Sequence, residues 1–166
     1  MSERLLAIYL NDHLAGSTVG VELARRARGS HRGGELGTFL EWLTAEIEAD
    51  RAALERLMEH FGIHKDPVKR GAGWVAEKAG RLKPNGQITG RSPLSDLVEL
   101  EGLHVGICGK LSMWEALEQA LGPEVAGINP STMAERARRQ LEDLRPHRIA
   151  AGAAAIAPDR DTAAAG

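Results

Sequence analysis

Residues 36–61 read LGTFLEWLTAEIEADRAALERLMEHF, and this segment indicates the class of fold. Its large apolar residues recur in alternating steps of four and three, the spacing of one face of an α-helix. The members of this face are Leu36, Leu40, Leu43, Ile47, Asp50, Leu54, Leu57 and Phe61. Glutamates lie on the opposite side, and Gly62 follows the last apolar residue. A long amphipathic helix is therefore predicted from about Glu35 to Phe61.

Asp50 is the exception on this apolar face. A buried carboxylate is costly unless it is hydrogen-bonded, paired with a cation or bound to a metal. Similar polar residues fall in or beside the apolar faces of the other helical patterns, and they are His13, Glu101, His104, Gln140 and His147. These side chains are the candidates for a functional site.

Three further segments have helical periodicity. The first runs from about Glu3 to Arg28 and is stopped by glycines. The next opens at Ser92-Pro93 and ends near Leu121, and the last opens at Asn129-Pro130 and continues to about Ala151. Pro146 lies within the last pattern and is expected to kink that helix or to end it early, because proline removes a backbone hydrogen bond.

A connection of about 30 residues separates the second and third helices, too long for a simple turn. Asp66-Pro67 resembles a helix start, so a short helix is expected from there to about Ala79. The predicted fold is all-α: a four-helix bundle with a short link, a long crossover containing a short helix, and a moderate link. This connectivity matches ferritin-like bundles. The bundle domain is assigned to residues 1–151, and residues 152–166 are expected to form an Ala-rich flexible tail.

Composition limits the classes of partner. The chain has 166 residues and a formal net charge of -2, which excludes broad electrostatic attraction to nucleic acid or anionic membranes. The single cysteine, Cys108, excludes an internal disulfide. The N-terminal apolar run is a poor signal peptide, and no apolar run reaches membrane-spanning length. The protein is therefore expected to be soluble and cytoplasmic, with no nucleic-acid or membrane partner.

The heights of the polar residues along the helices predict that they meet. His13 lies about 16 residues before the first link and Asp50 about 15 after it, so antiparallel helices would place them level. Glu101 and His104 are three residues apart and point into one space. We therefore expect a polar cluster at mid-bundle. Its members are His13, Asp50, Glu101 and His104, with Gln140 or His147 completing it.

The segment Glu101-Gly102-Leu103-His104 resembles the Glu-x-x-His element of the ferritin-like superfamily. In that family two helices carry such an element and two others each add a glutamate, which together bind two iron or manganese ions. The segments from Trp74 to Lys78 and from Arg91 to Leu94 are also similar to uncharacterised bacterial members of this type. The resemblance implies a ferritin-like fold and a metal site made of carboxylates and imidazoles.

The chain departs from the family pattern at several positions. It has one Glu-x-x-His, and His13 stands where the family has a carboxylate. Asp50 has no histidine three residues later, and the fourth helix offers Gln140, Asp143 and His147 in place of Glu-x-x-His. The resemblance therefore implies an incomplete ligand set, suited to one divalent ion of iron, manganese or zinc. The ligands would come from His13, Asp50, Glu101, His104 and His147.

The residues leave several functions open. The leading interpretation is a non-catalytic bundle in which the polar residues form a buried hydrogen-bond network that determines which helix faces pair. The alternative is a metal-binding protein with a degenerate site, with an oxidoreductase as its enzymatic form. A ligand pocket between helices is a third possibility. Transferases or hydrolases with three histidine ligands, here His13, His104 and His147, place two histidines on one helix, which this chain lacks.

Small residues form a line on the third predicted helix, with Gly102, Gly106 and Gly109 at its centre. A glycine inside a helix costs about 1 kcal/mol relative to alanine, so a close approach to another helix is expected to offset the cost. That approach would occur either inside the bundle or across the interface of a homodimer.

Overall fold

The computed structural model describes residues 2–66 and 92–157, which contain four long α-helices and no β-strand. The helices are α1 (Glu3–Ser30), α2 (Gly34–His60), α4 (Pro93–Leu121) and α5 (Pro130–Ile156). The prediction of an all-α fold with four long helices is confirmed. The short helix expected between Pro67 and Ala79 falls outside the described residues.

The starts of α4 and α5 follow the chemistry expected from their sequences. The Ser92 side chain accepts a hydrogen bond from the Leu94 amide, and Pro93 occupies the first turn, where no amide donor is needed. At α5 the Asn129 side chain accepts a hydrogen bond of 3.0 Å from the Thr132 amide, again followed by a proline. Both capping segments were predicted from the sequence.

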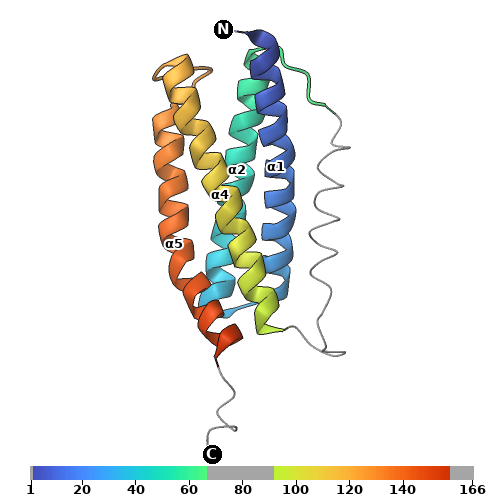
Figure 1. The fold of residues 1–166 in the computed structure, drawn as a ribbon, viewed down its shortest axis with the longest axis vertical. Helices are drawn as coiled ribbons and strands as arrows, with labels where there is room; N and C mark the ends of the chain where they lie inside the picture. Colours follow the sequence, from blue (N-terminus) through green and yellow to red (C-terminus); the bar gives the residue numbers. More distant parts are fainter. Residues whose placement is uncertain (1, 67–91, 158–166) are drawn as a thin grey trace, which may run out of the picture.

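The helices are arranged so that α1 and α2 are antiparallel, α4 and α5 are antiparallel, and α2 and α4 run in the same direction (Figure 1). Neighbouring helices make the pairs α1–α2, α1–α4, α4–α5 and α2–α5, so α2 and α4 lie across the diagonal of the bundle. The contacts between α2 and α5 are the sparsest of these pairs. This side of the bundle is therefore its least closely packed.

The hydrophobic core consists of two clusters stacked along the bundle axis. One lies toward the N-terminus of α1 and contains Leu6, Leu10, Leu14, Ala53, Leu54, Leu57, Met58, Met113, Trp114, Leu117, Ile128 and Ala134. The other lies toward the link between α1 and α2 and contains Val21, Ala24, Ala27, Leu40, Leu43, Ile47, Leu100, Leu103, Ile107, Ala137 and Leu144. Polar side chains occupy the level between them.

Helix α4 does not pack against the core with the face that carries Glu101. Leu100, Leu103 and Ile107 are buried, whereas Glu101 is exposed. The expectation that Glu101 projects into the interior is therefore wrong. Successive residues of a helix are rotated by about 100°, so burial of Leu100 turns Glu101 toward solvent. Apolar residues occur all around α4, and periodicity alone did not distinguish its faces.

Helix α5 continues through Pro146 and ends at Ile156. Of the two effects expected of this proline, a kink or an early end, α5 shows the kink, because its axis changes direction in its C-terminal part (Figure 1). Residues 152–156, assigned to the tail, are helical, and residues 158–166 lie outside the described part of the chain.

The line of small residues on α4 has one close contact. A Cβ atom on Gly102 would lie 2.8 Å from Leu23 Cδ2, so α1 and α4 approach each other closely at this point. A Cβ atom on Gly106 or Gly109 would meet no atom within 4 Å. The contact inside the bundle is thus present at Gly102, and the homodimer through this face stays a prediction.

None of the four described helices combines the length and apolar character needed to cross a bilayer.

Candidate functional site

Asp50 is buried at mid-bundle, with 4% of its surface exposed, as the sequence predicted. Its Oδ2 atom accepts hydrogen bonds from the ammonium group of Lys110 and from Gln140 Nε2, the latter at 2.9 Å. The same ammonium group donates to Gln140 Oε1. The three side chains therefore form a closed triangle of hydrogen bonds that joins α2, α4 and α5.

Arg136 supplies a second cation to Asp50. Its Nε atom lies 3.1 Å from Asp50 Oδ1 and 2.7 Å from Glu46 Oε2, and its Nη2 atom donates to the Glu46 carbonyl. The Nε–H bond is directed at Glu46, so Asp50 Oδ1 receives the electrostatic attraction of Arg136 without a directed hydrogen bond. Both oxygens of Asp50 thus face an internal cation.

We call Asp50, Lys110, Arg136 and Gln140 the polar layer. On α2, Asp50 lies between Ile47 of one core cluster and Leu54 of the other. On α4, Lys110 likewise lies between Ile107 and Met113. The polar layer therefore separates the two apolar halves of the core and links three of the four helices by charged hydrogen bonds, which are stronger than neutral ones.

Lys110 crosses the bundle to reach Asp50, because α2 and α4 are diagonal partners. Only 16% of its side chain is exposed. Burial lowers the pKa of Lys110 below the ordinary lysine value of 10.5, and the attraction of Asp50 offsets part of this effect. In the folded protein, the carboxylate and amide partners of this ammonium group replace most of the water that would otherwise surround it.

The lowered pKa of Lys110 predicts a pH dependence of stability. The folded protein releases this proton more readily than the unfolded chain, so the unfolded chain binds more protons just below pH 10.5. The free energy of unfolding of the native protein should therefore rise relative to that of Lys110→Met as pH increases through this window. Urea unfolding of both proteins at a series of alkaline pH values measures the difference. Burial raises the pKa of Tyr9, but Tyr9 is present in both proteins, so its contribution to the difference cancels. Parallel pH profiles would contradict the prediction.

The three candidate histidines are partly buried and lie apart from the hydrogen bonds of the polar layer. His13 packs edge-on against Tyr9 with ring centroids 4.6 Å apart, and burial lowers its pKa. His104 Nε2 lies 3.7 Å from Cys108 Sγ on the next turn of α4. His147 stacks on Phe39 at 4.3 Å. Of the candidate residues, the structure brings Asp50 and Gln140 together.

Within residues 2–66 and 92–157, no three His, Cys, Asp or Glu side chains gather closely enough to hold a metal ion. Asp50 is the buried carboxylate of the polar layer, and its partners are an ammonium, an amide and a guanidinium. The donor set around Asp50 is therefore that of an internal ion-pair network.

The sequence interpretation missed Lys110, although the pattern contains a signal for it. The buried residues Leu100, Leu103 and Ile107 are spaced by three and four, and the series continues at Lys110 and Trp114. A lysine at such a position is usually read as an exposed residue with a flexible stem. A buried carboxylate such as Asp50 requires a partner, and a basic residue on a core-facing position of another helix can supply it.

Glu99 is a second buried acid that the sequence interpretation missed. It lies on α4 and is almost fully buried, and Arg26 Nε of α1 lies 2.8 Å from its Oε1 atom. The Arg26 side chain is half exposed, so this pair links the interior to the surface at the level of the second core cluster. It adds a charged contact between α1 and α4.

The chemistry available at the polar layer is pairing of charges. Asp50 is engaged by two cations, Gln140 uses both its oxygen and its nitrogen, and Lys110 donates to both of these residues. Such a network of buried hydrogen bonds and ion pairs joins and orients the helices that carry it. Comparisons of the chain with known protein families, with curated proteins and with solved structures gave no match.

Proposed function

We propose that the protein is a non-catalytic, ferritin-like four-helix bundle in which the polar layer determines how the helices pair. The observation that carries the proposal is the position of Lys110, whose ammonium group is bonded to Asp50 and Gln140 at the level where a metal cation would sit in a ferritin-like protein. In this proposal the protein carries its own cation.

The geometry of the polar layer supports a role in specificity. Lys110 on α4 and Asp50 on α2 are joined across the diagonal, and Gln140 on α5 bonds to both. A rotation or a shift of one helix would leave a buried charge without its partner, at a cost of several kcal/mol. Alternative packings of four similar amphipathic helices are therefore disfavoured, as with a polar residue in the core of a coiled coil.

The directions of the helices support the ferritin-like part of the proposal. Helices α2 and α4 run the same way, as they do when a long crossover joins the second and third helices of a bundle (Figure 1). The antiparallel pairs α1–α2 and α4–α5 fit the same connectivity. Asp50 and Gln140 are buried in the bundle interior, which is where such bundles place their metal ligands.

The metal-binding alternative receives less support from this geometry. A metal ion at Asp50 would have to displace Lys110 and would then leave that ammonium group without its carboxylate partner. Glu101 faces solvent, which removes one of the two residues that carried the resemblance to Glu-x-x-His.

A titration with divalent metals tests the proposal. We expect Fe²⁺, Mn²⁺ and Zn²⁺ each to leave the melting temperature unchanged, since a ligand stabilises a protein only by binding its folded state. Bound metal at a hundred times its dissociation constant would add about 2.7 kcal/mol of stability.

The control for this titration is the double variant Glu101→Ala/His104→Ala. A saturable rise in melting temperature that this variant loses would contradict the proposal and support the metal-binding alternative. Elemental analysis of untagged protein gives an independent measurement, and stoichiometric metal would lead to the same conclusion.

A further inference from the structure

A groove lies between α2 and α5, on the side of the bundle where neighbouring helices make the fewest contacts. Its volume is about 590 Å³, within the range of small-molecule sites. The lining residues are Gly34, Glu35, Thr38, Phe39, Trp42 and His147. The groove is separate from the polar layer, none of whose residues lines it.

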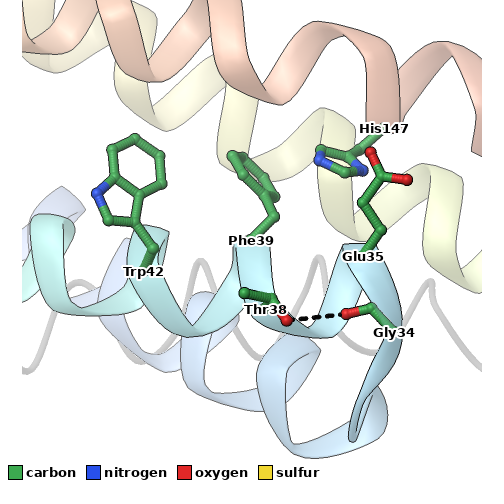
Figure 2. Close-up of a pocket in the computed structure, with 6 residues that line it drawn as sticks. All are labelled: Gly34, Glu35, Thr38, Phe39, Trp42 and His147. Carbon is green, nitrogen blue, oxygen red and sulfur yellow. Dashed lines mark hydrogen bonds between the residues drawn. The ribbon is translucent and has the colours of Figure 1, made fainter.

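Aromatic side chains form the floor of this groove. Figure 2 shows the rings of Trp42, Phe39 and His147 in a row, the first two from α2 and the last from α5. Phe39 stacks on His147 at 4.3 Å and lies 5.7 Å from Trp42. Aromatic residues make up only 4% of the chain. Trp42 is one of them, and it is 40% exposed. A partly exposed tryptophan beside two further rings is a surface suited to stacking.

The lining of the groove carries one formal negative charge. Glu35 is its one lining carboxylate, and Figure 2 places that carboxylate beside the His147 ring. Asp143 is exposed one turn before His147 on α5, so it lies on the same face of that helix. Arg136, farther along this face, is already paired with Glu46. Electron-rich ring faces and carboxylates both attract positive charge.

We propose that the groove binds a small organic cation with a flat or apolar body, such as an aromatic or alkyl ammonium compound. The apolar body lies along the row of rings from Trp42 toward His147, and the cationic nitrogen lies near the carboxylate of Glu35. Thr38 donates its hydroxyl proton to the Gly34 carbonyl, so it presents no free donor that would favour an anion. The ligand class follows from the aromatic floor and the Glu35 carboxylate together.

The test uses (4-phenylbutyl)trimethylammonium chloride as the probe with the full-length protein, because its chain is long enough to place the ring on Trp42 and the nitrogen near Glu35. Stacking on Trp42 should shift the probe's ring protons upfield, and titration of this shift gives a dissociation constant. We expect Trp42→Ala to weaken binding about fivefold and Glu35→Gln about threefold. Trp42→Phe retains a ring and should keep most of the affinity.

Matched controls separate the two parts of the site. Glu41→Gln removes an exposed carboxylate of α2 that does not line the groove, and it should leave the dissociation constant unchanged. 4-Phenylbutan-1-ol lacks the charge and tetramethylammonium lacks the ring, so each should bind more weakly than the probe.

Three results would overturn the proposal. One is the absence of saturable binding of the probe up to about 10 mM, a concentration that would reveal even a millimolar site. Another is binding of 4-phenylbutane-1-sulfonate as tight as that of the cation, which would show that the groove selects an anion or a ring alone. The third is unchanged affinity in Trp42→Ala, whose retained fold is checked by circular dichroism.

Discussion

Replacement of Asp50 by alanine is expected to lower the free energy of unfolding by about 3 kcal/mol, because it leaves the Lys110 ammonium group buried without its carboxylate. This loss of stability should lie at the lower end of the range observed when one partner of a buried ion pair is removed. Lys110 retains 16% side-chain exposure and can turn toward water, and its lowered pKa makes loss of the proton easier. Urea unfolding at neutral pH measures the effect, which corresponds to a decrease in melting temperature of about 10 °C.

Related substitutions distinguish the members of the network. Lys110→Met should cost less than Asp50→Ala, because Asp50 keeps Gln140 and Arg136 as partners. The double variant should be less destabilised than the sum of the two single variants, since the residues interact directly. Glu101→Ala is the control: its carboxylate is exposed, so its effect should stay within about 0.5 kcal/mol.

Asp50→Asn addresses the charge alone. A loss of stability would support an ionised and well-paired Asp50, whereas a gain would mean that the burial of its charge is poorly compensated. Additive costs in the double variant would contradict the pairing of Asp50 with Lys110 and with it the proposed role of the polar layer.

The sequence predicted the helices well because their ends carry local signals. Ser92-Pro93 and Asn129-Pro130 cap α4 and α5 as expected, and the bounds of all four helices except the end of α5 lie within two residues of those predicted. The exception has a physical reason. Proline removes one backbone hydrogen bond, but α5 continues through Pro146 because the alanine-rich residues that follow favour helix strongly.

The polar site was predicted only in part because tertiary contacts decide it. Asp50 and Gln140 could be recognised, since each lies on a helix with one clear apolar face. On α4 two apolar faces compete, and the choice between them is made by packing against α1 and α5 rather than by local sequence. The favoured face buries Glu99, turns the mostly buried side chain of Lys110 inward and exposes Glu101. The cations of the network come from helices distant in sequence, so spacing alone does not pair them with Asp50.

Replacement of Trp114 by alanine is expected to cost about 4 kcal/mol, the other large effect among these predictions. Trp114 is fully buried on α4 in the core cluster nearer the N-terminus of α1, where it packs with residues of the other helices. Its removal leaves a cavity that rigid helices can fill only in part. Chemical unfolding, with Trp42→Ala as the control for an exposed tryptophan, measures the loss, and the control should cost about 1 kcal/mol.

Trp114→Phe separates the volume of this side chain from its polarity. Trp114 Nε1 is buried and has no hydrogen-bond partner among the described residues. An unsatisfied buried donor costs about 1–3 kcal/mol, so phenylalanine removes that penalty while it creates a smaller cavity. The two effects oppose each other, and Trp114→Phe should therefore lose less than half of what Trp114→Ala loses. Equal losses in the two variants would contradict this prediction.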